Sequence, residues 1–387
     1  MFSSRTAWST APNKLAERLK RLKRAGADLF DLTESNPTRC GFIYDDERIL
    51  AALSTPDALR YSPSPRGLRS ARDAVAAYYE ELGTPTSADR IFLTTSSSEA
   101  YAWCFRLLCE PGDEVLVPSP SYPLFDYLSD LTDVRLTRYP LIYDHGWSID
   151  LDYLEKAITP RTKAILTVSP NNPTGSVLEA RDIDKLIRFS MRHSIALIAD
   201  EVFLDYGWPG GRPARTLSTR GLALSFTISG LSKVSAMPQM KLGWIVVRGP
   251  VGPDAAAAAR LEVIADTYLS VSTPTQVAAP VLMEQRRLVQ PQIRDRIAAN
   301  LAYLDQKLTG DTPVSRLQAD GGWYVILRAP ASSTDEEWAL FLLETAGVHV
   351  HPGHFFDFDG DARLVISLIT PENVFRAGID RIVEAVK

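Results

Sequence analysis

A lysine past the middle of the chain stands where amine chemistry could take place. Lys233 ends the segment Ser229-Gly-Leu-Ser-Lys233, which directly follows the apolar run Leu224–Ile228. The chain has only ten lysines against 32 arginines, so few amines are candidates. A lysine amine can form a Schiff base with a carbonyl compound, and crowding by other cations lowers its pKa. Taken alone, the position also suits a surface lysine in a loop.

Three further polar clusters follow apolar runs in the same way. Ser96 and Ser97 lie in a run of small hydroxyl residues that leads into a helical pattern, which suits a phosphate. Asn172 lies in a Pro- and Asn-rich turn, where its amide could bond to a ring hydroxyl. Asp200 follows the apolar run Ile195–Ala199, where a carboxylate needs a cationic partner. Each cluster also has a structural interpretation: the serines could cap a helix, Asn172 could belong to a plain turn, and Asp200 could form a buried ion pair.

Together these groups match the needs of a phosphorylated pyridine aldehyde. The lysine would hold the aldehyde and the serines the phosphate. The carboxylate would keep a proton on the ring nitrogen, which makes the ring an electron sink. In an open α/β sheet, ligands bind beyond the carboxyl ends of the strands. The clusters therefore predict a single site at one edge of one sheet.

The segments that carry these clusters alternate between strand and helix patterns. Alternation between about residues 90 and 250 indicates an α/β fold, with a mainly parallel, buried sheet in a three-layer domain. After about residue 265 the pattern becomes that of a smaller α+β unit. We predict a large domain over 41–264, and a small domain formed by 1–40 with 265–387. The predicted strands of the large domain are Ile91–Thr95, Glu114–Pro118, Lys163–Ser169, Ile195–Asp200, Leu224–Ser229 and Gly243–Arg248.

Composition narrows the class of protein. The chain has 387 residues, of which 45% are hydrophobic and 23% charged, as in ordinary globular proteins. A net charge of −5 leaves no basic excess for nucleic acid. No run of eighteen apolar residues predicts a membrane span. Three cysteines and an N-terminus without an apolar leader favour a cytoplasmic location.

The ordered motifs resemble those of the class I/II aminotransferases that use pyridoxal 5'-phosphate (PLP), the aspartate and aromatic aminotransferase superfamily of fold type I. The resemblance rests on Pro170-Asn-Asn-Pro-Thr-Gly175, Asp200-Glu-Val-Phe203 and Ser229-Gly-Leu-Ser-Lys233 in this order. It spans nearly the whole chain. It implies PLP as cofactor and transfer of an amino group from an L-amino acid to a 2-oxo acid in a ping-pong cycle, through a Schiff base on Lys233.

The resemblance also assigns roles to individual residues. Lys233 would be the Schiff-base lysine and acid/base, and Asp200 would pair with the ring nitrogen. Arg363 would clamp the substrate carboxylate, and the substrate would also meet Asn172 and Ser35. Tyr61 would reach the phosphate in the neighbouring subunit, which implies a homodimer. The other residues implied to hold the cofactor are Ser96, Ser97, Tyr122, Asn172, Ser229 and Lys241.

Four positions depart from the common pattern of that family. Phe203 replaces a tyrosine, Lys241 stands where many members have an arginine, and Ser35 replaces a glycine near the substrate carboxylate. Tyr268 falls roughly where members specific for aspartate place an arginine, so an uncharged or aromatic substrate side chain is expected. His351 and His354 are too isolated from other ligands to predict a metal site.

Two other functions stay open on the sequence alone. A PLP-dependent lyase or a cyclising amino-acid synthase of the same fold would keep Lys233, Asp200, Asn172 and Arg363. A non-catalytic, PLP-binding regulator is disfavoured because Lys233 is intact and because no DNA-binding domain fits before residue 30.

Overall fold

A central sheet of eight strands organises the larger part of the molecule. The computed structural model describes residues 1–219, 222–358, 360 and 362–387. The strand order is β2-β9-β8-β7-β6-β3-β4-β5. Strands β9 and β5 run in the direction opposite to the other six. The strands are β2 Ile91–Thr94, β3 Glu114–Ser119, β4 Arg135–Tyr143, β5 Trp147–Ile149, β6 Thr162–Val168, β7 Ala196–Asp200, β8 Ser225–Gly230 and β9 Gly243–Arg248.

All six strands predicted for the large domain are present, with ends that differ by at most one residue. The strands β4 and β5 were not predicted. β4 lies near the edge of the sheet, and its pattern of exposed and buried residues is irregular, so neither a continuous apolar run nor strict alternation marks it. The mainly parallel sheet is confirmed.

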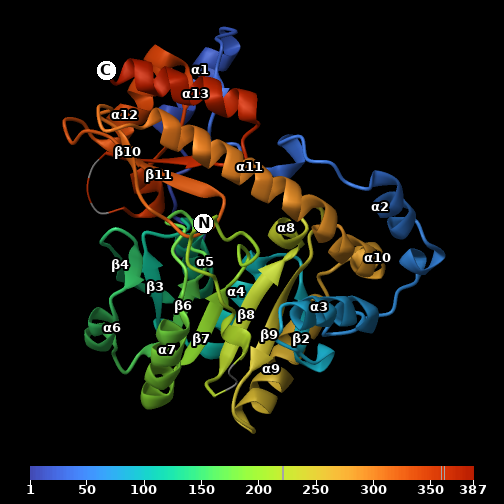
Figure 1. The fold of residues 1–387 in the computed structure, drawn as a ribbon. Coiled ribbons are helices and arrows are strands. Elements are labelled where there is room, and N and C mark those ends of the chain that lie inside the picture. Colours follow the sequence, from blue (N-terminus) through green and yellow to red (C-terminus); the bar gives the residue numbers. More distant parts are fainter. Residues whose placement is uncertain (220–221, 359, 361) are drawn as a thin grey trace.

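Helices cover both faces of this sheet (Figure 1). Side chains alternate along each strand, so that Phe92 packs with α4, α5 and α9, while Ile91 and Leu93 pack with α3 and α10 on the other face. Helices α6 and α7 also cover this second face. The three-layer arrangement is therefore confirmed. The helices are α3 Arg69–Glu81, α4 Ser97–Leu108, α5 Leu124–Thr132, α6 Leu151–Ala157, α7 Ala180–His193, α8 Leu231–Val234, α9 Pro253–Tyr268 and α10 Thr273–Glu284.

A second, smaller sheet lies over the carboxyl ends of the parallel strands (Figure 1). Its order is β10-β11-β14-β13, and all of its pairs are antiparallel. The long helix α11 runs between the two parts of the molecule (Figure 1). The strands are β10 Ser315–Arg316, β11 Tyr324–Arg328, β13 His351–Pro352 and β14 Arg363–Ser367, and the helices of this part are α11 Arg286–Lys307, α12 Asp335–Phe341 and α13 Glu372–Ala385.

The N-terminal segment joins the C-terminal part of the chain. Strand β1, Phe30–Asp31, pairs in parallel with β12, Val348–His349, and helix α1, Lys14–Arg24, packs against α12. Helix α2, Asp46–Leu53, instead contacts α10. The exact limits 41–264 and 265–387 remain a prediction. No described helix is long and apolar enough to cross a membrane.

Candidate active site

A cavity of about 450 Å³ opens where the ends of the parallel strands face the small sheet. The predicted residues that line it from the large-domain side are Ser96, Ser97, Tyr122, Asn172, Asp200 and Lys233. Ser35, Tyr324 and His351 line it from the opposite side. The sequence clusters at separate strand ends are therefore brought together at one site, as expected.

Lys233 lies in the short helix α8, which directly follows β8. Its Nζ is 4.4 Å from the ring centroid of Trp323 and 5.2 Å from that of Phe203. Burial lowers the pKa of Lys233 to about 8, and the opposing influence of Asp200 is smaller. Because more of the amine is then unprotonated near neutral pH, Lys233 is a better nucleophile and base than an exposed lysine.

Asp200 ends β7 at the floor of the cavity, with 8% of its surface exposed. The Tyr101 hydroxyl donates to its Oδ2, and the Val202 amide donates to Oδ1 over 2.9 Å. Burial raises the pKa of Asp200, while the bonds from Tyr101 and Val202 and the charge of Lys233 oppose the rise. A cationic group in the cavity would stabilise the ionised carboxylate further.

Asn172 reaches the cavity from a turn that its neighbour Asn171 holds in place. Asn171 N–H donates to Ser176 O over 2.9 Å, and Thr174 Oγ1 donates to Asn171 Oδ1 over 2.9 Å. Gly175 has φ +66°, and a Cβ there would lie 2.5 Å from Gly321 O, so only glycine fits. Asn172 Oδ1 is buried without a partner among the described residues.

The start of α4 forms another wall of the cavity. Ser96 caps the helix and accepts from Glu99 N–H over 3.2 Å. A Cβ on Gly243 would lie 3.0 Å from Thr94 Oγ1 and 3.1 Å from the carbonyl carbon of Ser96, so the backbone of β9 approaches this helix end closely. The free N–H groups and the dipole at the start of a helix favour an anion such as phosphate.

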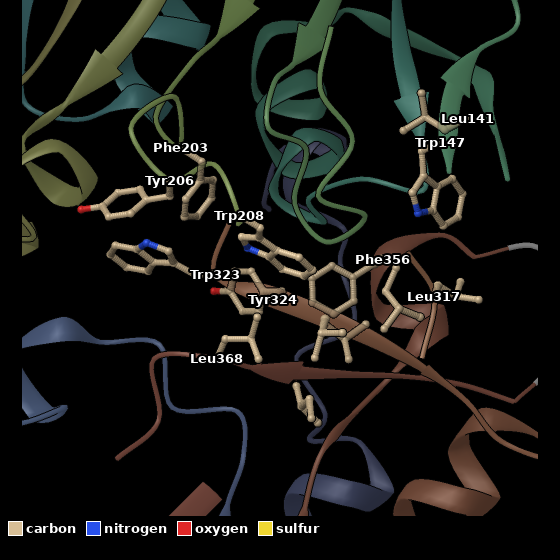
Figure 2. Packing of buried hydrophobic residues seen from close by; sticks show 14 of the residues in the cluster. Leu141, Trp147, Phe203, Tyr206, Trp208, Leu317, Trp323, Tyr324, Phe356 and Leu368 are labelled. Carbon is tan, nitrogen blue, oxygen red and sulfur yellow. The ribbon is translucent and has the colours of Figure 1, made fainter. Parts of the chain in front are cut away.

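Aromatic rings fill the space between the two parts of the molecule beside the cavity. Figure 2 shows Phe203 and Tyr206, from the loop after β7, next to Trp323 and Tyr324 of the small part. The rings of Phe203 and Trp323 lie edge to face at 5.4 Å. The Tyr206 hydroxyl donates to Lys233 O over 2.7 Å. Phe203 thus packs beside the lysine amine and brings no hydroxyl to the cavity.

Three predicted cofactor residues do not line the cavity. Ser229 is 1% exposed and its Oγ has no partner among the described residues; because side chains alternate along β8, Gly230 lines the cavity instead. Lys241 has φ 52° and an exposed side chain, whereas Leu242 and Gly243 reach the cavity. Tyr61 is 79% exposed and borders a separate hollow, which leaves it available to a partner subunit.

Arg363 is not among the residues that line the cavity, and its contact with the substrate carboxylate stays a prediction. It begins β14 and pairs with Arg328 of β11. Burial lowers the pKa of Arg363, with a smaller contribution from the Arg328 charge and an opposing one from Tyr143. Two residues along the same strand, Val365 pairs with the cavity residue His351.

The position of Tyr268 is likewise away from the cavity. Its ring stacks against Trp103 with centroids 6.2 Å apart, and its hydroxyl accepts from Arg106 over 2.8 Å. Tyr122 lines the cavity as expected and is 43% exposed. No group of three or more metal-ligating side chains occurs in the described part of the chain.

Comparisons with known proteins agree with this geometry. A family model for aminotransferases of class I and II matches residues 31–382. The chain belongs to this family. The alanine aminotransferase of Mycobacterium tuberculosis is 28% identical over 360 residues, which cover 92% of this chain and 78% of that protein. The tyrosine aminotransferase of Mus musculus is 27% identical over 409 residues, covering 97% and 87% of the two chains.

The fold is shared with solved aminotransferases. Alanine aminotransferase from Pyrococcus furiosus matches with a TM-score of 0.88 and 23% identity, over 99% of both chains. A variant of Thermus thermophilus aspartate aminotransferase matches with a TM-score of 0.87 and 24% identity, over 100% of this chain and 99% of that one. The α/β class and PLP fold type I are confirmed.

The protein is therefore an aminotransferase, and its predicted transamination is confirmed. The lyase and cyclising alternatives are not favoured, because the similar curated proteins are named alanine, glutamate-pyruvate and tyrosine aminotransferases. Aminotransferases of this family depend on PLP and act on amino acids and 2-oxo acids.

Sequence reasoning missed several residues that line the aminotransferase cavity. Tyr101 was not predicted as a site residue, yet its hydroxyl donates to Asp200 Oδ2. A helical position four residues after Ser97 lies on the same face of the helix, which could have signalled it. His351 and Tyr324 could not be placed without the pairing of β11, β13 and β14.

Proposed function

We propose that this cavity binds PLP and an amino acid with an uncharged side chain, with Lys233 as the catalytic base. The observation that carries the proposal is the buried Lys233 amine, whose pKa is lowered, in the same cavity as the buried Asp200 carboxylate. Asn172 and the start of α4 would hold the remaining polar groups of the cofactor.

The polar groups of the cavity fit this cofactor. Asn172 Oδ1 has no protein partner among the described residues and can meet a polar substituent of the ring. Ser96, Ser97 and Ser98 at the start of α4 line the cavity, so this helix end is open to a phosphate. Asp200 provides an anion for a protonated ring nitrogen. A lysine, a carboxylate, an amide and a helix end thus lie on one cavity wall.

Each of these residues has a defined task in transamination. PLP supplies an aldehyde and a ring that accepts electrons. Lys233 Nζ would remove the proton from the substrate Cα and return a proton during the transfer of the amino group. Asp200 would hold the proton at the ring nitrogen, and Tyr101 would hold Asp200 in position through its hydroxyl. Tyr122 would cover one face of the ring.

The substrate side chain would meet mainly apolar groups. Phe125, Phe355 and Phe356 line the cavity, together with Leu124 and Val202. Lys233 is the only lysine or arginine among its described lining residues, so this chain offers no second cation to a distal carboxylate. An uncharged amino acid therefore suits the cavity better than a dicarboxylic one.

A homodimer would complete the site with the partner subunit's Tyr61. Tyr61 is exposed, and the exposed apolar residues Ile43, Leu50 and Leu59 lie in the same segment of the chain. Apolar side chains gathered along one exposed segment favour burial against another molecule. This arrangement would explain why Tyr61 lies outside its own cavity.

A half-reaction with one amino acid at a time tests the proposed function. The PLP-loaded protein is mixed with single amino acids, and the cofactor absorbance is followed. We expect uncharged amino acids to convert the cofactor once to its pyridoxamine form, and a 2-oxo acid to restore it. Continuous release of ammonia or a thiol with an unchanged cofactor would contradict transamination. Failure of borohydride to link PLP to the Lys233 peptide would contradict the cofactor assignment.

Mixed dimers test the role of Tyr61. Lys233→Ala and Tyr61→Ala chains are expressed together, and the hybrid dimer is purified with two different affinity tags. We expect each homodimer to have little activity and the hybrid to recover one working site. A hybrid no more active than the homodimers, or a monomer in solution, would overturn the shared site.

A further inference from the structure

The short helix that carries Lys233 needs support from other parts of the chain. Helix α8 spans only Leu231–Val234, and a single helical turn is unstable by itself in water. The turn that follows it contains Ala236 with φ +52°, a left-handed conformation that is unfavourable for alanine. Such a backbone keeps one shape only where surrounding residues fix it. The position of the Lys233 amine therefore depends on contacts to this segment.

Two tyrosine hydroxyls donate to backbone oxygens of this segment. The Tyr206 hydroxyl donates to Lys233 O over 2.7 Å. The Tyr44 hydroxyl donates to Ala236 O over 2.8 Å. Lys233 O also accepts from Ala236 N–H over 3.1 Å, which closes the turn. The two tyrosines thus fix the turn at both of its ends, and Tyr206 bonds to the lysine itself.

The ring of Tyr206 acts on the other end of the same lysine. Tyr206 is fully buried, and its ring lies edge to face against that of Trp323 with centroids 5.1 Å apart (Figure 2). The ring of Trp323 in turn lies 4.4 Å from Lys233 Nζ. Tyr206 therefore contacts the backbone of the lysine through its hydroxyl and supports the ring that covers the amine.

Backbone contacts hold Tyr206 where two loops meet. Its N–H donates to Phe203 O over 2.9 Å, and its carbonyl accepts from Gly322 N–H over 2.8 Å. A Cβ on Gly321 would lie 2.7 Å from Tyr206 O, so the two loops approach closely here. Gly322 directly precedes Trp323 in the chain. Tyr206 itself does not line the cavity, so it acts on a bound molecule only through its neighbours.

We propose that Tyr206 is a positioning residue for Lys233: its hydroxyl fixes the backbone of the lysine, and its ring holds Trp323 against the amine. The proposal rests on the proposed function of Lys233 as the lysine that binds PLP and moves the proton. Proton transfer needs the base within about 3 Å of the proton's carrier, and a misplacement of about 1 Å can slow a reaction about 10²-fold. Support at both ends keeps the amine at one place in the cavity.

The reactivity of the Lys233 amine in the protein without PLP gives a readout that a loss of folding stability alone would not move. The protein is labelled with a trace of acetic anhydride at a series of pH values, and the Lys233 peptide is quantified by mass spectrometry. Its reactivity should level off above about pH 8, because burial lowers the pKa of Lys233 to about 8 and Asp200, the charged group that faces it, opposes this less. We expect Tyr206→Phe to raise the midpoint by about one pH unit, because a loosened amine gains contact with water.

The half-reaction of the PLP-loaded variants tests the consequence for catalysis. We expect Tyr206→Phe to lower the saturated rate about tenfold, with the half-saturating amino-acid concentration changed little, because the contacts to the substrate remain. Tyr206→Leu also removes the ring that packs on Trp323. Its saturated rate should fall further, to about 10²-fold below that of the unaltered protein.

Tyr139→Phe is the matched control for a general loss of stability. The Tyr139 hydroxyl donates to Leu166 O over 2.9 Å within the large sheet, and neither residue lines the cavity. Both variants lose one buried bond from a tyrosine to a carbonyl, so both should lower the melting temperature by a similar amount. Only Tyr206→Phe should change the midpoint and the saturated rate. If it changes neither, or if Tyr139→Phe changes both as much, the proposal is overturned.

These measurements separate the proposal from the proposed function. If PLP cannot be attached to Lys233 of the unaltered protein, the proposed function fails, and the labelling without PLP still reports whether Tyr206 positions the amine. If PLP attaches and the half-reaction proceeds, but Tyr206→Phe behaves as Tyr139→Phe does, only the positioning role of Tyr206 is overturned.

Discussion

The two walls of the cavity are built in different ways. The large-domain wall takes Asn172, Asp200 and Lys233 from loops and strand ends that follow β6, β7 and β8. The opposite wall takes Tyr324 and His351 from strands that pair through β14. The first wall carries ionisable groups with shifted pKa values, and the second offers mainly neutral donors and aromatic rings.

This difference shows which site residues can be placed from short sequence motifs and which depend on strand pairing. In a parallel sheet each strand end points to the same edge, so a polar residue after an apolar run is already placed. In the antiparallel small sheet, a residue reaches the cavity only if the strand register brings it there. We therefore expect the residues that hold the cofactor to be predictable from local motifs, and those that recognise the substrate to depend on strand pairing.

The largest expected loss of activity comes from a substitution on the large-domain wall. Lys233→Ala removes the base that moves the substrate Cα proton, and general acid–base catalysis contributes about 10²- to 10⁴-fold. We expect the half-reaction to slow about 10³-fold or more, measured in a stopped-flow spectrometer. A rate within tenfold of the unaltered protein would show that another group moves the proton.

Asp200→Asn should have the next largest effect. It removes the buried anion that would pair with a cationic ring, and loss of one partner of a buried pair costs about 3–5 kcal/mol. The saturated half-reaction rate should fall about 10²- to 10³-fold. Tyr101→Phe is the matched milder change, because it keeps the carboxylate and removes only its hydrogen bond. Equal effects of the two variants would contradict a role for the Asp200 charge.

The pH dependence of PLP attachment reports on Lys233 directly. Because burial lowers its pKa to about 8, the neutral amine should be fully formed above this pH. Below pH 8 the attachment rate should fall about tenfold per pH unit. A rate that keeps rising to pH 10 would indicate an ordinary, exposed lysine.

A smaller effect, on the pH dependence of folding stability, is expected from Glu201, the buried carboxyl next to Asp200. Glu201 is 2% exposed, accepts from Leu217 N–H over 2.7 Å and does not line the cavity. Burial raises its pKa from 4.5 to about 8. The folded state therefore keeps its proton between these values while the unfolded state loses it, so stability falls as pH rises through this window.

Glu201→Gln should remove that loss of stability. We expect its melting temperature to match the unaltered protein at pH 5 and to exceed it by about 2–4 °C at pH 9. Thermal unfolding monitored by circular dichroism measures both. If the melting temperature of Glu201→Gln falls between pH 5 and pH 9 by as much as that of the unaltered protein, Glu201 is not the group responsible.

The sequence could predict much of the fold because the buried strands are short apolar runs. The six predicted strands of the large sheet all form. Helix α9, Pro253–Tyr268, is harder to predict, because its alanine-rich sequence has little contrast between its faces. Helix ends are also hard to predict where two helices meet, as α10 and α11 do at Gln285.

The candidate site was predictable on one wall and not on the other. Asp200, Asn172 and Lys233 follow strands and reach the cavity as expected. Side-chain alternation in β8 brings Gly230 to the cavity lining in place of Ser229, whose role at the cofactor stays a prediction. Arg363 begins β14 and pairs with Arg328, a register that a one-dimensional motif does not specify, so its contact with the substrate stays a prediction.

Single-turnover kinetics of Asp200→Asn and His351→Ala, measured side by side with an uncharged amino acid, test the division between the walls most directly. We predict that Asp200→Asn lowers the saturated rate with half-saturation changed little, and that His351→Ala raises the half-saturating concentration with the saturated rate changed little. If both variants change the same parameter to a similar extent, the two walls do not have separate tasks and the account is wrong.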